Sequence, residues 1–132
     1  RGVRTMREKI YRGQRVDNGE WCYGSLIELG DRKYICFADK CHNIMNAGAL
    51  SFEVIPETIG QFTGFIDKND KKIFERDIVL VDGKRCIVVF ENGCYYPMGA
   101  YVARSGFEYD KEDYRIIGNI YDNPELLKEV EE

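Results

Sequence analysis

The sequence has few of the features that mark the commonest functional classes. It has one histidine, one tryptophan and three prolines in 132 residues. It contains no apolar run near the roughly 20 residues that cross a bilayer, and no charged and then apolar leader of the signal-peptide kind. We therefore expect a soluble protein of the cytoplasm with no membrane contact.

Cysteine and histidine are spaced in a way that predicts no disulfide framework and no metal site. The five cysteines are an odd number and include no close Cys-x-x-Cys pair, so free thiols in a reducing cytoplasm are the simpler interpretation. Cys36, Cys41 and His42, with Cys22 in a neighbouring strand, are the only set that could bind zinc, and their spacing matches no recognised zinc motif. The same residues could form a Cys–His nucleophile pair, but no glycine loop of the oxyanion type accompanies them. We expect neither metal nor cofactor.

Charged residues are plentiful but evenly mixed. The net charge is −4, so the field of the whole molecule weakly repels nucleic acid. The acidic residues around 108–113 and 125–132 fall in a polar loop and a terminal helix, where we expect them to be solvated and not held in an apolar cleft. We therefore predict a protein without enzymatic activity.

Plentiful Tyr, Phe, Val and Ile, with frequent glycine, predict a mainly β chain with many turns. Asn18-Gly19 and Gly30-Asp31 are turn dipeptides, and each predicts a hairpin. A short strand then ends at Pro56. The expected strands of this first part cover residues 9–12, 20–24, 26–29, 33–37 and 50–55.

The segment 56–60 is the predicted boundary between two subdomains. We interpret residues 1–5 as a disordered leader or a cloning remnant, and residues 6–58 as an N-terminal β-hairpin subdomain. Residues 59–132 form the second subdomain, which ends in a short helix. Asn123-Pro124 is expected to supply the N-cap and the first-turn proline of that helix. Its apolar side would consist of Leu126, Leu127 and Val130.

The second subdomain contains a predicted meander with strands at 77–81, 84–90 and 94–98. If Asp82-Gly83 and Asn92-Gly93 are two-residue turns, both faces of this meander are apolar. One face can line a small barrel, while the other needs cover from the N-terminal subdomain, the C-terminal helix or another subunit. This is the main indication of homo-oligomerisation. The two faces carry Ile78, Leu80, Ile87, Val89, Tyr96 and Met98 on one side, and Val79, Val81, Cys86, Val88, Phe90, Tyr95 and Pro97 on the other.

A charged tip at residues 67–72 invites comparison with a calcium loop, because Asp67 and Asn69 occupy the first two ligand positions of that motif. Lys71 and Lys72 then replace the third ligand and the required glycine, and Ile78 stands where a bidentate Glu is needed. We interpret the segment as a structural hairpin whose tip binds no ion.

Taken in order, these segments resemble the YopX family of phage and prophage proteins. The resemblance covers nearly the whole chain and rests on several short stretches together. It implies a mainly β protein with an SH3-like small barrel in its C-terminal part and no assigned activity. The stretches are Ile10-Tyr-Arg-Gly13, Asp17-Asn-Gly-Glu-Trp21, Val54-Ile-Pro-Glu-Thr58, Gly60-Gln-Phe-Thr-Gly64, Asp77-Ile-Val79 and Ile117-Gly-Asn-Ile-Tyr-Asp-Asn-Pro124.

The chain departs from the pattern of that family at Arg76, where the family usually has glycine. A non-glycine residue with positive φ costs on the order of 1–2 kcal/mol. Either Arg76 has negative φ, or the strain is tolerated for something that its guanidinium does.

We therefore predict a non-enzymatic protein of the phage type, in the cytoplasm of a bacterial host, that acts through protein contacts and associates with itself. Its partner would be an unidentified phage or host protein. The alternative is a small barrel that binds nucleic acid, since aromatic side chains with arginines around them can stack on bases. The residues expected to make contacts are Trp21, Tyr23, Arg76, Tyr95 and Tyr96.

Overall fold

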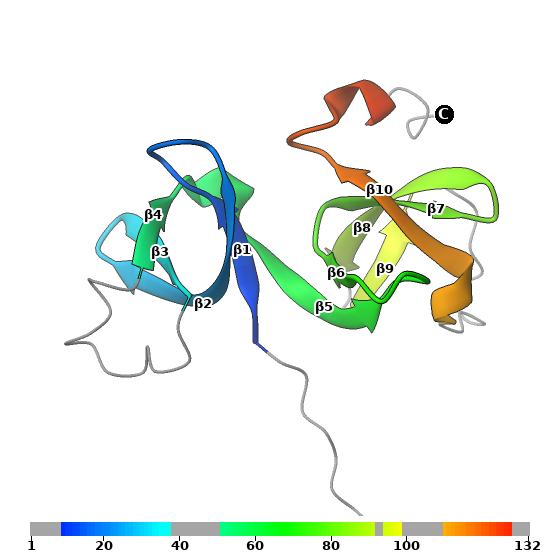
Figure 1. Cartoon of the computed structure of the whole chain (residues 1–132), viewed down its shortest axis with the longest axis horizontal. Helices are drawn as coiled ribbons and strands as arrows, with labels where there is room; N and C mark the ends of the chain where they lie inside the picture. Colours follow the sequence, from blue (N-terminus) through cyan, green and yellow to red (C-terminus); the bar gives the residue numbers. More distant parts are fainter. Residues whose placement is uncertain (1–8, 38–50, 92–93, 99–109, 128–132) are drawn as a thin grey trace, which may run out of the picture. The chain divides into compact units, whose positions relative to one another are not determined.

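The computed structural model describes residues 9–37, 51–91, 94–98 and 110–127, with the backbone alone for residues 90–91 and 94–98. The described chain consists of β-strands and short turns (Figure 1). The prediction of a mainly β protein is therefore confirmed. Its helical segments are the 3-10 turns η1 (Pro56–Thr58), η3 (Lys111–Asp113) and η4 (Pro124–Leu126).

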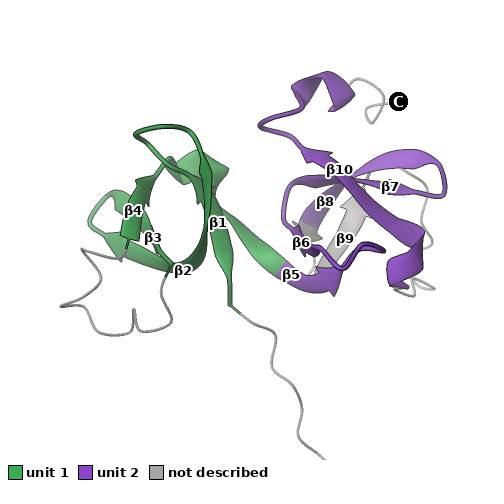
Figure 2. Cartoon of the chain, in the orientation of Figure 1, with its two compact units in different colours: residues 1–62 green, residues 63–132 purple. Residues whose placement is uncertain are grey.

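The chain divides into two compact units, residues 1–62 and 63–132 (Figure 2). Unit 1 contains the first four strands and the beginning of β5, and its strands belong to an antiparallel sheet of order β4-β3-β2-β1-β5-β6. These strands are β1 (Tyr11–Gln14), β2 (Trp21–Leu29), β3 (Arg32–Cys36), β4 (Ser51–Val54) and β5 (Gly60–Ile66).

Strand β2 is one continuous strand of nine residues, whereas the sequence predicted two strands separated at residue 25. Its first half pairs with β1 and its second half with β3. Gly24 stands at the changeover, because a Cβ there would overlap the carbonyl oxygen of Cys36 at the end of β3. Only glycine lets the two backbones approach this closely.

The core of unit 1 forms from side chains that alternate along these strands. Cys22, Ile35 and Val54 are buried, and Leu26 and Phe52 pack against them. The end of β1 also bonds to β4: the amide of Ile55 donates to the carbonyl of Gln14 at 2.8 Å, and that of Val16 donates to Glu53 at 2.9 Å. The strands of unit 1 therefore curl around one apolar interior.

Unit 2 is built around a second antiparallel sheet of order β10-β7-β8-β9. Asp82 and Gly83 both have positive φ, at 53° and 78°, which matches the predicted two-residue turn. The register places Val81 opposite Lys84 and Glu91 opposite Cys94, so the predicted pairing of the meander is confirmed. The four strands of this sheet are β7 (Asp77–Val81), β8 (Lys84–Glu91), β9 (Cys94–Met98) and β10 (Tyr114–Asn119). Unit 2 also contains β6 (Lys72–Phe74), which belongs to the first sheet.

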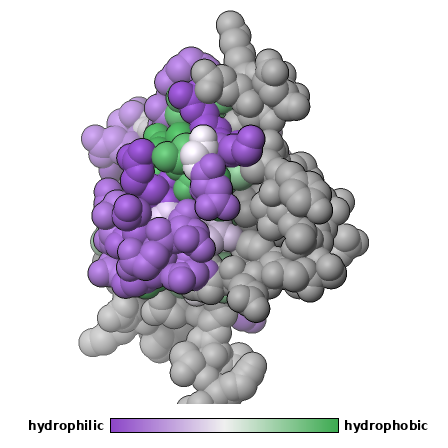
Figure 3. Space-filling view, turned by 90° about the vertical axis from the view of Figure 1, so that its right-hand side faces the viewer, coloured by the Kyte–Doolittle hydropathy of each residue, from purple (hydrophilic) through white to green (hydrophobic). Residues whose placement is uncertain are grey.

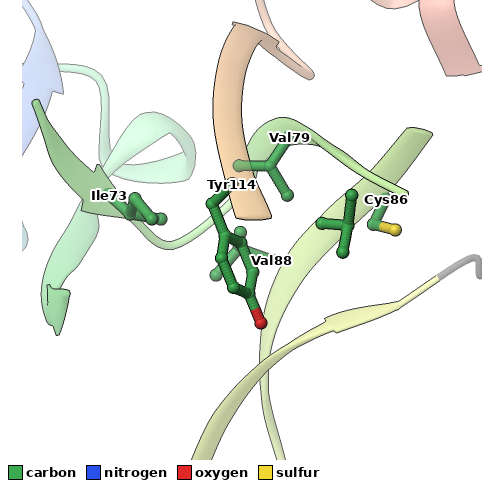
Figure 4. Packing of buried hydrophobic residues seen from close by; sticks show 6 residues of the cluster. Ile73, Val79, Cys86, Val88 and Tyr114 are labelled. Carbon is green, nitrogen blue, oxygen red and sulfur yellow. The ribbon is translucent and has the colours of Figure 1, made fainter. Parts of the chain in front are cut away.

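One face of this sheet forms the core of unit 2. In Figure 4, Val79, Val88 and Tyr114 from three different strands point toward one another, with Ile73 from β6 beside them. The opposite face carries Ile78, which is fully buried, and Leu80 and Ile87, which are half-buried. Both faces are therefore apolar, as the register predicted.

The described strands form two antiparallel sheets without a closed barrel, so the SH3-like barrel stays a prediction. Two details of the predicted turns and caps differ from the structure. Asn123 does not cap the turn η4 with its side chain: its Oδ1 accepts from the amide of Asn119 at 3.2 Å, and most of the expected C-terminal helix lies outside the described residues. Asn18 lacks the positive φ of a type I′ turn and instead uses its side-chain oxygen to accept from the amide of Glu20.

Candidate protein-contact surface on strand β2

The outer face of β2 carries a row of side chains that we call the β2 stripe, composed of Trp21, Tyr23, Ile27 and Leu29. Successive residues of a strand point to opposite faces. Cys22 and Leu26 lie in or against the core of unit 1, so the odd-numbered residues of β2 point outward. The stripe contains no charged side chain, and its fifth outward position is Ser25.

Two members of the β2 stripe are strongly exposed: Tyr23 at 49% and Leu29 at 53% of their surface. Trp21 and Ile27 are half-buried. The other large hydrophobic residues exposed among the described residues, Val16 and Phe37, also lie in unit 1. On the face drawn in Figure 3, the right-hand side of Figure 1, the described residues are mainly hydrophilic around one small hydrophobic group. Exposed apolar side chains that share one strand face are typical of a contact surface.

Arg12 fixes the indole at one end of the stripe. It stands opposite Tyr23 in the β1–β2 register, and its guanidinium carbon lies 4.8 Å from the centre of the Trp21 ring. Arg12 is only 5% exposed. A cation over an indole face contributes about 0.5–1 kcal/mol at exposed sites and about 2 kcal/mol when desolvated. The ring of Trp21 is thus held in place, which lowers the entropy lost on binding.

A second arginine, Arg15, packs on an aromatic ring of unit 1. The guanidinium carbon of Arg15 lies 3.7 Å from the centre of the Phe52 ring, and Phe37 stacks on Phe52 at 5.2 Å. Arg15 also donates two hydrogen bonds to Asp17, at 2.9 and 2.7 Å. This hydrogen bonding holds the pKa of Asp17 below its ordinary value. Arg15 is thus occupied within the protein, which leaves little of its charge for a nucleic-acid phosphate.

The structure places the predicted contact residues in different units. Trp21 and Tyr23 are neighbours on the β2 stripe, whereas Arg76 belongs to unit 2. Tyr95 and Tyr96 pair with Phe90 and Val89, and their side chains lie outside the described part of the molecule. The sequence analysis missed Ile27 and Leu29 as contact residues. Counting every second residue from Trp21 would have found them, had β2 been recognised as continuous through Gly24.

Arg76 has positive φ, at 75°, so the first alternative, a negative φ, is wrong. Both backbone groups of Arg76 are used: its amide donates to the carbonyl of Val88 at 2.9 Å, and its carbonyl accepts from the amide of Ile120 at 3.2 Å. These bonds tie the turn before β7 to β8 and to the end of β10, which explains the backbone conformation. The side chain is exposed, and nothing in the structure explains why it is arginine.

The charged tip contains a buried carboxylate, Asp67, which the sequence analysis considered only as a possible calcium ligand. Asp67 is fully buried. Its Oδ1 accepts from the amides of Asn69 and Lys71, both at 2.9 Å, and its Oδ2 accepts from the amide of Ile116 at 3.0 Å. Burial alone would raise the pKa of Asp67, but the three amide donors and the charge of Lys71 outweigh it and lower the pKa. Asp67 therefore anchors the tip to β10.

The described residues contain no cluster of three or more His, Cys, Asp or Glu side chains that could hold a metal ion. Cys41 and His42 lie outside the described residues, so the zinc hypothesis is not tested here. Cys22 and Cys86 are buried free thiols, and burial raises the pKa of Cys22. Cys36 is disulfide-bonded, so the expectation of free thiols is wrong at this position. Spacing along the chain could not reveal that bond, because its geometry depends on the fold.

The model of one protein family, described as YopX protein, matches residues 10–128. No curated protein matches the chain. In the described part of the chain, no helix is both long and apolar enough to span a membrane.

Proposed function

The chain belongs to the YopX family, and from that premise we propose a non-enzymatic protein of the phage and prophage type that associates with itself through the β2 stripe. We place this role in the cytoplasm of the bacterial host, with phage or host proteins as further partners. The SH3-like barrel implied by the resemblance remains part of this proposal.

The observation that carries the proposal is the pair of exposed residues Tyr23 and Leu29 on one strand face, in line with Trp21. Tyr and Trp dominate the energetic centres of protein interfaces. Packing against a second copy is favoured because the stripe has no charged side chain. Two copies related by a twofold axis present the same surface to each other, and like charges near the axis would repel.

The alternative function is binding of single-stranded nucleic acid, which one observation favours: Trp21 and the exposed Tyr23 could stack on bases. The arginines beside them are engaged on aromatic rings or with Asp17. Since the net charge is also −4, electrostatic attraction to phosphates is weak. Protein contacts therefore rank first.

The test is size-exclusion chromatography with light scattering, read at protein and nucleic-acid wavelengths. We expect a mass that is a multiple of 15.3 kDa, and a shift toward the single-chain mass in the double variant Tyr23→Lys, Leu29→Lys. Val16→Lys is the matched control, because Val16 is 54% exposed but lies off the stripe. A wild-type mass of one chain at high micromolar concentration would overturn the proposal. Co-elution with an added oligonucleotide, lost in the double variant, would favour the alternative.

A further inference from the structure

The outward side chains of β2 follow an order of sizes that is nearly the same in both directions along the strand. Two large side chains precede the smallest one and two large side chains follow it, in the order Trp21, Tyr23, Ser25, Ile27 and Leu29. Ser25, in the middle, is exposed. A surface with this symmetry can pack against a second copy that is turned by a half-rotation about an axis through its centre.

Polar side chains border the β2 stripe at both ends. In the register, Gln14 of β1 stands opposite Trp21, and Arg32 of β3 stands opposite Leu29. Between these ends, β3 contributes Tyr34, which is half-buried. An apolar centre inside a polar rim is the usual anatomy of a protein–protein interface.

Two copies can pack the β2 stripes face to face with the strands either antiparallel or parallel. Packed sheets lie about 10 Å apart, with strand directions within about 30° of each other. In the antiparallel arrangement the twofold axis crosses β2 at Ser25. Trp21 then faces Leu29 of the second copy, and the next outward positions, Tyr23 and Ile27, face each other in the same way. In the parallel arrangement every residue faces its own counterpart.

The sizes of the side chains favour the antiparallel arrangement. It pairs an aromatic with an aliphatic side chain at each level, so the two sheets stay evenly spaced. The parallel arrangement brings two indoles together at one end and two leucine side chains together at the other, which leaves a gap at the leucine end. Trp21 is not able to move aside and close that gap, because Arg12 holds its ring at 4.8 Å. Protein interiors pack at nearly uniform density, and the cost of a cavity rises with its volume.

We propose that two copies of the chain pack with their β2 strands antiparallel and with the twofold axis at Ser25. This inference rests on the self-association proposed above and adds which residues meet. Ser25 is the outward position of β2 that faces itself, so a charge placed there meets an equal charge of the second copy. The two copies of Leu29 are eight residues apart along the strands, which is about 27 Å.

The test uses mixtures of variants, because a residue on the axis faces its own counterpart. Ser25→Asp and Ser25→Lys are prepared separately and then mixed one to one, and light scattering measures the average mass. Each variant alone should associate at least about tenfold more weakly than wild type, because like charges meet at the axis. The mixture should regain association, because the mixed pair places opposite charges there.

The matched control is the pair Leu29→Asp and Leu29→Lys. These variants carry the same charges on an exposed residue of the same strand. The two substituted positions lie about 27 Å apart in the antiparallel arrangement, well beyond the Debye length of about 8 Å at physiological ionic strength. Mixing these two variants should therefore restore no association.

The outcomes separate this arrangement from self-association as such. A wild-type mass of one chain would overturn the proposed function and this arrangement with it. If the wild type associates, three results would overturn the arrangement alone: Ser25→Asp that associates as well as wild type, a Ser25 mixture that does not recover, or a Leu29 mixture that does. The last result would indicate parallel strands.

Circular dichroism establishes whether the Ser25 variants are folded. If one is not, Tyr23→Lys and Ile27→Glu replace the pair, because these two positions face each other in the antiparallel arrangement and not in the parallel one. Their mixture should regain the association that each variant loses alone. A mixture that stays at the single-chain mass would overturn the arrangement.

Discussion

At the residue scale, Arg76 and Asp67 show how much a single position in unit 2 can contribute. Arg76 adopts a conformation that glycine adopts without strain, and its backbone bonds to Val88 and Ile120 require that conformation. Asp67 does the reverse, since its charged side chain satisfies three backbone amides of other residues. The backbone strain at Arg76 lowers the free energy of unfolding, whereas the hydrogen bonds of Asp67 raise it.

Arg76→Gly should raise the melting temperature by a few degrees. The substitution relieves about 1–2 kcal/mol of backbone strain in the folded state. Glycine also has more conformational entropy in the unfolded chain, which lowers the free energy of unfolding by about 0.4–1 kcal/mol. Thermal unfolding followed by circular dichroism measures the change. Arg76→Ala is the control, because it removes the same side chain but keeps the Cβ that causes the strain. An equal rise in both variants would show that the guanidinium, and not the backbone, is responsible.

Asp67→Asn should lower the free energy of unfolding by about 1.5–3 kcal/mol, the range for hydrogen bonds to a charged group. The amide keeps one acceptor oxygen and places an NH2 group opposite a backbone donor. Asp70→Asn is the control, because Asp70 is exposed and its ion pair with Lys111 contributes at most about 1 kcal/mol. Urea titration of both variants measures the difference, and similar losses would argue against the anchoring role of Asp67.

The carboxylate of Asp67 should also make the stability of the protein depend on pH. Its pKa is lower in the folded protein than in the unfolded chain, so its stabilising effect is complete above the unfolded pKa and disappears as the pH falls through the folded pKa. Below about pH 4, the difference in melting temperature between wild type and Asp67→Asn should therefore shrink. Melting curves from pH 7 to pH 2.5 measure it, and a constant difference would mean that Asp67 does not ionise in the folded state.

At the element scale, β2 decides the architecture of unit 1. It is long enough to pair with β1 and then with β3, and the changeover needs a residue without a side chain at Gly24. The same continuity aligns Trp21 and Tyr23 with Ile27 and Leu29. The strand thus determines both the core and the candidate contact surface.

Gly24→Ala should destabilise the protein by about 3 kcal/mol or more, because the added methyl overlaps the backbone of β3 and the sheet must open. Gly30→Ala is the matched control. Gly30 also has positive φ, at 64°, but open space surrounds the position of its Cβ, so only about 1 kcal/mol of strain is expected. Thermal melts of both variants test this, and equal losses would mean that close approach is not what excludes a side chain at position 24.

The element scale also shows where sequence patterns are sufficient. The Asp82-Gly83 turn and the alternation of apolar residues predicted the register of β7, β8 and β9, because a two-residue turn fixes which residues face each other. The pattern failed at Gly24 and Ser25, where a glycine inside a strand resembles a break. It failed again at Asn123, whose side chain bonds back to Asn119 and not forward into a helix.

At the scale of the whole molecule, net charge and apolar surface act on self-association in opposite directions. Each copy carries a charge of −4, so two copies repel each other, whereas the β2 stripe of unit 1 is apolar and uncharged. Added salt screens the repulsion between the copies.

Raising sodium chloride from low to high concentration should increase the average mass seen by light scattering, because the repulsion between copies is screened. Self-association that falls with salt would assign it to charged groups and not to the β2 stripe.

The sequence by itself determined the β-rich character, the turns that carry glycine, and the register of the meander. These depend on local backbone preference and on the alternation of side chains along a strand, which are properties of neighbouring residues. The tertiary structure alone decided that Asp67 is a buried anchor and that Gly24 must lack a side chain. Each of these depends on a partner distant in the chain, and such a partner is known only once the strands have paired.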